Sequence, residues 1–446
     1  MGKYFGTDGV RGIANEGLDP ELAFRLGHAA ATALTDEAGG RQDIIIGKDT
    51  RISSDMLEAA LAAGVASAGA RAVLLGVAPT PAVAFAAKEN GAAGIVISAS
   101  HNPYEYNGIK IIDRQGYKLP DKTEERVEAL MGETPALKKG REIGGIVRDT
   151  ALLDAYCDSL LRAADGGKYS GLSAVFDCAN GAACATAERV FGKIGLKRRG
   201  FINTAPDGAN INNRCGSTNR AALCEAVLAG GYDVGLAFDG DADRCLAADE
   251  GGAPMDGDAM LALLALGERK AGLLERDTLV TTIMSNFGLY EWGKREGAVI
   301  KTVKVGDRYV LEEMLAGGYS VGGENSGHVI FLKYATTGDG QLTALKLLSL
   351  LGESGAAASV LAKTVSIYPQ VLINVAVTPR AKERWESDAR VREEIGKAEA
   401  ALRGHGRVLV RASGTENLVR VMLEGKEQAT VESLARNIAS GIEVLC

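Results

Sequence analysis

Short apolar runs alternate with alanine- and leucine-rich segments along most of the chain. The runs at 43–51, 94–98, 173–181, 232–240 and 277–286 have the composition of buried strands and lead into polar, turn-forming residues. The intervening segments, such as 56–70, carry apolar residues at helical spacing. This alternation predicts parallel sheets covered by helices, with ligands gathering at the carboxyl ends of the strands.

The strand-turn-helix pattern returns in three blocks and then stops. We expect three related α/β units with mixed or parallel sheets over residues 1–150, 151–250 and 251–367 of the 446-residue chain. Beyond Pro369 the chain becomes polar and strand-rich. It closes with an amphipathic helix whose apolar positions are Val431, Leu434, Ala435, Ile438 and Ile442. Residues 368–446 are therefore predicted to form a fourth, smaller α+β domain.

Composition and charge narrow the classes of protein. No apolar run is long enough to span a bilayer, and the first residues lack the apolar core of a signal peptide, so we expect a cytoplasmic protein without membrane contact. The net charge of −7 and the lack of a basic stripe argue against nucleic-acid binding. The seven cysteines form no C-x-x-C pair, which indicates small buried hydrophobes rather than a disulfide framework or a zinc site.

Three aspartates, Asp239, Asp241 and Asp243, are spaced two apart at the end of the strand-like run at 232–240. Like charges this close repel unless a cation lies among them, and an all-oxygen set suits Mg²⁺. A calcium loop is disfavoured because its sixth position, where a glycine is needed, is Arg244. A solvated acidic turn and a phosphatase with an aspartyl nucleophile stay open as alternatives.

Several loops have the composition of phosphate and sugar sites. "RASGTENLVR" at 411–420 combines two arginines, two hydroxyls and a Gly-Thr turn that suits an anion nest. "TVKVGDRYV" at 302–310, with Arg308, and "GGENSGH" at 322–328 are glycine-rich loops whose polar side chains suit sugar hydroxyls. "GTDGVRG" near the start adds Arg11 beside two glycines. Each of these loops alone is also compatible with an ordinary turn.

Taken together, the motifs resemble the α-D-phosphohexomutase family over nearly the whole chain. They are "GTDGVRG", "SASHNP" followed by "NGIK", "DGDADR", "GGENSGH", "TTGDG" and "RASGTEN", in the order and at the spacing of that family. The resemblance implies four domains around a central cleft, three of them related α/β units. Within the family, "YFGTDGVRG" and "GGENSGH" are most similar to members that interconvert glucosamine 6-phosphate and glucosamine 1-phosphate, a step toward UDP-N-acetylglucosamine and cell-wall precursors.

The resemblance also implies roles for individual residues. Ser100 matches the serine that carries a covalent phosphate, and one Mg²⁺ per subunit is held by that phosphoserine with Asp239, Asp241 and Asp243. The transfer site further contains Arg11, His101, Lys110 and Arg244. The sugar contacts Glu324, Asn325, Ser326 and Arg308, whereas the phosphate that is not reacting is held by Arg411, Ser413, Gly414, Thr415 and Arg420.

The chemistry of these residues agrees with a phosphoryl relay. Ser100 donates its phosphate to a sugar monophosphate, and the resulting 1,6-bisphosphate turns in the cleft and returns its other phosphate to Ser100. Lys110 and His328 are the candidates for the general base. We expect a glucose or glucosamine bisphosphate as activator and closure of the fourth domain to exclude water, and a homodimer is left open.

Two departures from the family pattern bear on the sugar rather than on the reaction. Asn417 replaces the usual proline of the phosphate loop, and Asn325 stands where the glucosamine enzymes usually have glutamine. Phosphoglucomutase or phosphomannomutase activity is therefore the near alternative. A sugar-phosphate phosphatase and an inactive sugar-phosphate-binding protein are the alternatives from other classes.

Overall fold

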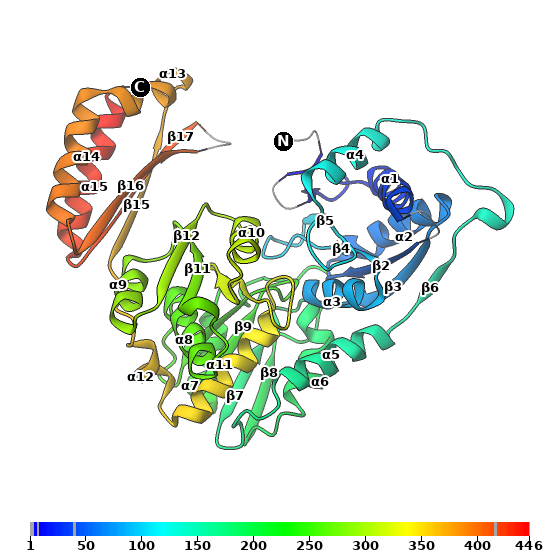
Figure 1. The fold of residues 1–446 in the computed structure, drawn as a ribbon, viewed down its shortest axis with the longest axis horizontal. Helices are drawn as coiled ribbons and strands as arrows, with labels where there is room; N and C mark the ends of the chain where they lie inside the picture. Colours follow the sequence, from blue (N-terminus) through cyan, green and yellow to red (C-terminus); the bar gives the residue numbers. More distant parts are fainter. Residues whose placement is uncertain (1–3, 7–8, 39–41, 414–416, 446) are drawn as a thin grey trace. The chain divides into compact units, whose positions relative to one another are not determined.

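The structure is a computed structural model, and it describes residues 4–6, 9–38, 42–413 and 417–445. By its internal contacts the chain divides into two compact units. Unit 1 comprises Met1–Ile283 and Lys301–Lys363, and unit 2 comprises Met284–Ile300 and Thr364–Cys446. Figure 1 labels most of the helices and strands of both units.

A six-stranded mixed sheet with the order β1-β5-β4-β2-β3-β6 begins unit 1. Strands β2, β3, β4 and β6 run parallel, whereas β5 is antiparallel to both β1 and β4. The strands are β1 (Val10–Ile13), β2 (Asp43–Lys48), β3 (Arg71–Val77), β4 (Ala93–Ile97), β5 (Tyr106–Ile112) and β6 (Ile146–Arg148). The helices are α1 (Pro20–Ala38), α2 (Ile52–Ser67), α3 (Thr80–Asn90) and α4 (Asp121–Met131).

Helices cover both faces of this sheet (Figure 1). Ile44 and Ile46 of β2 are buried in one cluster with Leu26 of α1 and Leu61 of α2. Gly47 faces the other side, where an added Cβ would lie 2.4 Å from a methyl carbon of Val83 in α3. Because alternate residues of a strand point to opposite faces, burial on both faces explains the nearly continuous apolar runs in the sequence.

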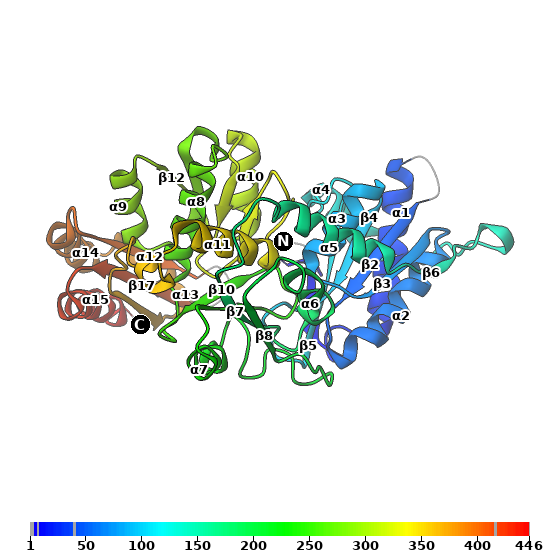
Figure 2. The same cartoon turned by 90° about the horizontal axis from the view of Figure 1, so that it is seen from below.

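The second and third sheets of unit 1 have four strands each, in the orders β10-β9-β7-β8 and β12-β11-β13-β14. Helix α7 packs on β7 and β9 (Figure 2). The strands are β7 (Ser173–Asp177), β8 (Arg198–Ile202), β9 (Val234–Phe238), β10 (Cys245–Asp249), β11 (Thr278–Thr282), β12 (Val299–Val303), β13 (Val321–Gly323) and β14 (Val329–Phe331). The helices are α5 (Ala151–Ala163), α6 (Ala187–Phe191), α7 (Ala221–Gly230), α8 (Gly257–Lys270), α10 (Asp307–Gly317), α11 (Gly340–Ser354) and α12 (Ala358–Ala362).

The three sheets repeat one arrangement of strands. In the first, β4 pairs with the antiparallel β5 on one side and with the parallel β2 on the other. In the second, β9 pairs in the same way with β10 and β7, and in the third β13 pairs in the same way with β14 and β11. The predicted repeat of three related α/β units with mixed sheets is therefore confirmed.

Unit 2 contains an antiparallel sheet of order β15-β17-β16. Helices α14 and α15 lie side by side, and α15 packs on β15 and β17 (Figure 1). The predicted amphipathic helix is confirmed as α15, with Val431, Ala435, Ile438 and Ile442 buried. The elements are α9 (Phe287–Glu296), β15 (Gln370–Ala376), α13 (Pro379–Arg384), α14 (Ala389–Leu402), β16 (Gly406–Ala412), β17 (Leu418–Gly425) and α15 (Gln428–Glu443).

A buried carboxylate fastens α9 to the sheet of unit 2. Glu424, at the end of β17, accepts hydrogen bonds from the backbone N–H of Phe287 (3.0 Å) and from Nε of Arg407 (2.6 Å). Asn286 and Tyr368 exchange two further hydrogen bonds of 2.9 Å. These contacts explain why residues 284–300 cluster with the C-terminal residues.

No helix among the described residues is both long and apolar enough to cross a membrane. The six cysteines of the described part are free thiols, and four of them are buried.

Candidate active site

The site in unit 1 forms where β4 and β9 end. Ser100 lies three residues beyond the end of β4, and Asp239 directly follows β9. The hydroxyl of Ser100 donates to Oδ2 of Asp239 at 2.7 Å, and both residues are buried. Gly240 makes this approach possible, because a Cβ there would lie 2.5 Å from the carbonyl oxygen of Ser100.

The backbone of Ser100 is held in an unusual conformation. Its φ of 52° lies in the left-handed region, which costs a residue other than glycine on the order of 1 kcal/mol. The N–H of Ser100 donates to Oγ of Ser98 at 2.9 Å. The carbonyl oxygen accepts from Nη2 of Arg51 at 2.9 Å and from Nδ2 of Asn212 at 2.8 Å. The surroundings thus supply a partner for each polar group of this peptide unit.

Sequence reasoning missed Arg51 and Asn212. Arg51 ends the strand-like run at 43–51, and a side chain just beyond a strand carboxyl end was the available signal. Asn212 lies in the loop after β8 and gives no comparable signal, because asparagine is common in turns.

Asp239, Asp241 and Asp243 come together as a cluster that fits a cation. One carboxylate oxygen of each lies within 4.8 Å of those of the other two, and all three residues are buried. Oδ1 of Asp241 and Oδ1 of Asp243 have no hydrogen-bond partner. Since buried carboxylate oxygens are seldom left without a partner, the cluster has the donor set and the bonding capacity for a hard divalent cation.

The pKa values within the cluster diverge. Burial, together with the charges of Asp243 and Asp241, raises the pKa of Asp239 well above its usual value. Burial and the charge of Asp241 raise the pKa of Asp243. Burial acts in the same sense on Asp241, but the charge of Lys110 and the hydrogen bond from Thr80 outweigh it and lower the pKa of that carboxyl. A cation would favour the ionised form of all three.

Three cationic or ionisable side chains, those of Lys110, Arg244 and His101, lie at or next to the carboxylates. Nζ of Lys110, on β5, lies 3.4 Å from Oδ2 of Asp241 and 4.0 Å from Oδ2 of Asp243. Nη1 of Arg244 lies 3.3 Å from Nδ1 of His101. Burial, with the charges of Arg244 and Arg11, lowers the pKa of His101 to about 4, so its ring is neutral at pH 7.

The glycine-rich loop at 322–328 forms a tight turn between β13 and β14. The N–H of Glu324 donates to the carbonyl oxygen of His328 at 2.9 Å, and Oε1 of Glu324 accepts from the N–H of Gly306 at 3.0 Å. His328 is buried, yet neither of its ring nitrogens has a hydrogen-bond partner, and the hydroxyl of Ser326 also has none. Asn325 is exposed.

A cavity of about 450 Å³ collects most of the predicted residues of unit 1. Its lining includes Arg11, Ser100, His101, Asp243, Arg244, Glu324 and His328. Arg308 is not part of this lining, because its guanidinium forms ion pairs with Asp121 of α4 and with Glu312, the latter at 2.8 Å. Residues predicted for phosphoryl transfer and residues predicted for sugar binding therefore line the same cavity.

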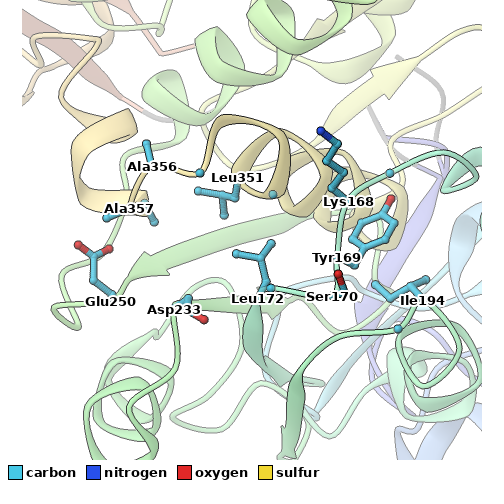
Figure 3. Close-up of a pocket in the computed structure, with 16 residues that line it drawn as sticks. Lys168, Tyr169, Ser170, Leu172, Ile194, Asp233, Glu250, Leu351, Ala356 and Ala357 are labelled. Carbon is cyan, nitrogen blue, oxygen red and sulfur yellow. The ribbon is translucent and has the colours of Figure 1, made fainter.

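A second, larger cavity of about 760 Å³ lies elsewhere in unit 1 (Figure 3). It is bordered by the loop at 167–172 and by residues 351–358, and its labelled charged side chains are Lys168, Asp233 and Glu250. None of the predicted site residues lines it.

The predicted phosphate loop belongs to unit 2. Arg411 and Arg420 are directly opposite each other on the antiparallel strands β16 and β17, and the N–H of Ser413 donates to the carbonyl oxygen of Leu418 at 2.8 Å. Two like charges in opposite positions destabilise a strand pair unless an anion lies between them. Gly414 and Thr415 lie outside the described residues.

Models of four domains from one family match consecutive parts of the chain. Their descriptions are phosphoglucomutase/phosphomannomutase alpha/beta/alpha domain I (residues 2–137), domain II (154–252), domain III (256–368) and the C-terminal domain (372–441). The chain belongs to the phosphoglucomutase/phosphomannomutase family. The resemblance found in the sequence motifs is thereby confirmed.

Curated and solved relatives are similar over the full length. A phosphoglucosamine mutase from Caldicellulosiruptor saccharolyticus is 50% identical over 451 residues, which cover 99% of each chain. A family member of known structure from Burkholderia thailandensis has a TM-score of 0.82 at 24% identity, covering 98% of this chain and 96% of that one. N-acetylphosphoglucosamine mutase from Aspergillus fumigatus, solved in complex with GlcNAc-6P and magnesium, has a TM-score of 0.69 at 20% identity, covering 99% and 96%. At such identities the two structures support the fold alone.

Proposed function

We propose that this chain interconverts glucosamine 6-phosphate and glucosamine 1-phosphate through a phosphate carried on Ser100 and a 1,6-bisphosphate intermediate. The hydrogen bond of 2.7 Å between Ser100 and the acidic cluster carries the proposal, because it places a hydroxyl beside a site for a cation. The full-length identity of 50% to a phosphoglucosamine mutase supports glucosamine as the sugar. The product supplies the cytoplasmic synthesis of UDP-N-acetylglucosamine and cell-wall precursors.

Each half of the reaction exchanges one P–O bond for another. The bond between phosphorus and Oγ of Ser100 breaks while the bond from phosphorus to the sugar hydroxyl oxygen forms, and the hydroxyl proton passes to a general base. The bisphosphate then turns over, and the opposite transfer returns the other phosphoryl group to Ser100. The sugar leaves as the isomer, and the enzyme recovers its phosphoserine.

Asp239, Asp241, Asp243 and the Ser100 phosphate are the proposed ligands of one Mg²⁺. The ion supplies neutralisation of the charge that develops on the transferred phosphoryl group. Arg11 and Arg244 add fixed positive charge at the same cavity. Nδ1 of the neutral His101 ring accepts from Nη1 of Arg244 at 3.3 Å, and the same nitrogen lies 3.4 Å from Oγ of Ser100.

Lys110 and His328 are the two candidates for the general base. The Lys110 ammonium lies beside two carboxylates, so it must lose a proton before it can accept one. His328 lines the cavity, and its buried ring nitrogens have no hydrogen-bond partner within the protein, which makes its imidazole the second candidate. Glu324, Asn325, Ser326 and Arg308 are proposed to select the sugar, and Arg411, Ser413, Gly414, Thr415 and Arg420 to hold the phosphate that is not reacting.

Glucose and mannose phosphates are the second candidate substrates, because Asn325 replaces the glutamine usual in the glucosamine enzymes. The test is intact-protein mass spectrometry with peptide mapping, followed by incubation with glucosamine 6-phosphate and Mg²⁺. We expect a phosphate on Ser100 that exchanges with substrate, and glucosamine 1-phosphate as product. A Ser100 that stays unmodified after glucose 1,6-bisphosphate is supplied would refute the relay, and release of free phosphate without an isomer would indicate a phosphatase.

A further inference from the structure

Arg51 is a buried arginine whose guanidinium holds the backbone of the loop that carries Ser100. Nη2 donates to the carbonyl oxygens of Ser100 and Asn102, both at 2.9 Å. Nη1 donates to the carbonyl oxygens of Tyr106, at 3.0 Å, and of Pro103. One side chain therefore binds four carbonyl groups within seven consecutive residues.

Asp49 connects this guanidinium to the other side of Ser100. Its Oδ2 accepts from Nε of Arg51 at 2.7 Å and from the hydroxyl of Ser98 at 2.6 Å. Ser98 in turn accepts from the N–H of Ser100 at 2.9 Å. The N–H and the carbonyl group of Ser100 are thus both tied to one buried carboxylate, through Ser98 on one side and Arg51 on the other.

The residues next to Arg51 bind loops of the second sheet, which carries the acidic cluster. The hydroxyl of Thr50 donates to the carbonyl oxygen of Asn180, and the N–H of Ile52 donates to the carbonyl oxygen of Gly208 at 2.9 Å. The turn between β2 and α2 therefore contacts both the Ser100 loop and the sheet that ends in Asp239. This arrangement fixes the Ser100 hydroxyl relative to Asp239.

We propose that Arg51, backed by Asp49, is a positioning residue that holds Ser100 in its left-handed conformation with the hydroxyl aimed at the acidic cluster. The inference rests on the proposed phosphoserine relay, and it adds a residue that touches neither substrate nor metal. The planar guanidinium group has enough N–H donors, in a fixed geometry, to bind four carbonyl oxygens at once. A lysine at position 51 would keep the positive charge but could not bind all four carbonyl groups. Misplacing a reacting group by about 1 Å can cost about a hundredfold in rate.

The test compares R51K with R220K. Arg220 is a matched control because its Nη1 also binds two carbonyl oxygens, those of Ala247 (3.2 Å) and Met255 (2.6 Å), away from the Ser100 loop. We expect R51K to lower kcat about 10- to 100-fold, with KM for glucosamine 6-phosphate changed less than about twofold. R220K should leave both constants near those of the parent protein.

Two further measurements separate positioning from folding. Hydrogen exchange of the peptide covering residues 98–108 should be faster in R51K and unchanged in R220K. If R51K fails to fold, S98A serves in its place, because it removes the acceptor of the Ser100 N–H and leaves Arg51 intact. We expect kcat of S98A to fall by less than the about 10- to 100-fold expected for R51K, with KM unchanged. The proposal would be overturned if kcat of R51K stayed within twofold of the parent value, or if R51K and R220K lost activity equally. If S98A is used because R51K does not fold, a kcat of S98A within twofold of the parent value would overturn it.

Failure of the proposed reaction is distinguishable from failure of this inference. If the parent protein yields no isomer, the relay is wrong whatever the variants do. The exchange rate of peptide 98–108 then decides the role of Arg51 by itself, because unchanged protection in R51K would show that the guanidinium does not hold the loop.

Discussion

The two sides of the cavity in unit 1 differ in which polar groups lack a hydrogen-bond partner. On the transfer side (Ser100, His101, Lys110, Asp239, Asp241, Asp243 and Arg244), the Ser100 backbone and hydroxyl are tied to Ser98, Arg51, Asn212 and Asp239, and the atoms without a partner are Oδ1 of Asp241, Oδ1 of Asp243 and Nε of Arg244 at the acidic cluster. On the sugar-loop side (residues 322–328), the two ring nitrogens of His328 and the hydroxyl of Ser326 have no partner.

This difference matches two chemical tasks. Phosphoryl transfer depends on positioning, which the protein supplies before the substrate arrives. Recognition of a sugar depends on donors and acceptors that the sugar itself satisfies, and a site built in this way rejects analogues that leave those groups unpaired. Substitutions on the transfer side should therefore act on kcat, whereas substitutions of the proposed sugar contacts Glu324, Asn325 and Ser326 should act on kcat/KM and on the choice of sugar.

The largest effect is expected from S100A. Removing the hydroxyl removes the acceptor of the phosphoryl group, so isomer formation should fall below detection while the melting temperature stays near that of the parent, since a loop hydroxyl adds little to the core. Product analysis with glucosamine 6-phosphate and a thermal melt check both expectations. Measurable isomer formation by a folded S100A protein would exclude the relay.

The next effect is expected from D241N, which removes one of the clustered carboxylates. We expect activity to fall about 100- to 1,000-fold and the increase in melting temperature on adding Mg²⁺ to disappear, because the cation loses a charged ligand. Activity and thermal melts over a range of Mg²⁺ concentrations measure this. D36N is the control, since Asp36 is an exposed residue paired with Arg126. An unchanged response of D241N to Mg²⁺ would contradict the proposed site.

The variants H328A and K110M test which side of the cavity supplies the general base, since His328 is on the sugar-loop side and Lys110 on the transfer side. Loss of the base should lower kcat about 100-fold or more, and loss of the other residue should cost less. We expect the larger loss in H328A, because the ring nitrogens of His328 are without partners whereas Lys110 is held by carboxylates. Steady-state kinetics of both variants decides the matter. A larger loss in K110M would move the base to the transfer side.

The smallest expected effect is on stability and comes from Asp339. This buried residue caps the N-terminus of α11, which follows the sugar loop in the chain. Its Oδ1 accepts from the N–H of Leu342 at 3.0 Å, its Oδ2 accepts from the hydroxyl of Tyr156 at 3.0 Å, and burial raises its pKa to about 6. The folded state thus favours the protonated form, so this group adds stability as the pH falls through 6 and opposes folding above it.

The variant D339N mimics the protonated carboxyl. We therefore compare the difference between the two melting temperatures, D339N minus parent. This difference should become more positive between pH 5 and pH 7.5, because only the parent carboxyl ionises over that range. Thermal melts of both proteins over this range provide the measurement. A difference that stays constant or falls with pH would mean that Asp339 is not destabilised by ionisation.

Much of the fold could be predicted from the sequence, because its signals are local. The run at 43–51 predicted β2, and the apolar spacing at 431–442 predicted α15, since burial selects residues at the period of the element itself. The clustering of Asp239, Asp241 and Asp243 was also predictable from a local signal, because only one residue lies between successive aspartates of a single loop.

Contacts between distant residues could not be predicted in this way. Arg51 binds a loop 49 residues away, and Arg308 pairs with Asp121 across 187 residues. The end of a strand-like run was a signal for Arg51, but the sequence around neither arginine identifies these partners. The roles assigned to the site residues stay predictions until the variants above are measured.

The attachment of α9 to the C-terminal sheet bears on how this protein can be taken apart. A truncation that removed residues 364–446 would strip Phe287 of the Glu424 carboxylate and of the edge-on Tyr368 ring, whose centroid lies 5.4 Å from its own. The shortened chain would expose the ring of Phe287 at the start of an amphipathic helix and leave its N–H without that acceptor, and exposed apolar surface favours aggregation. Shuffling the C-terminal domain between relatives would succeed best if residues 284–300 were exchanged with it as one cassette.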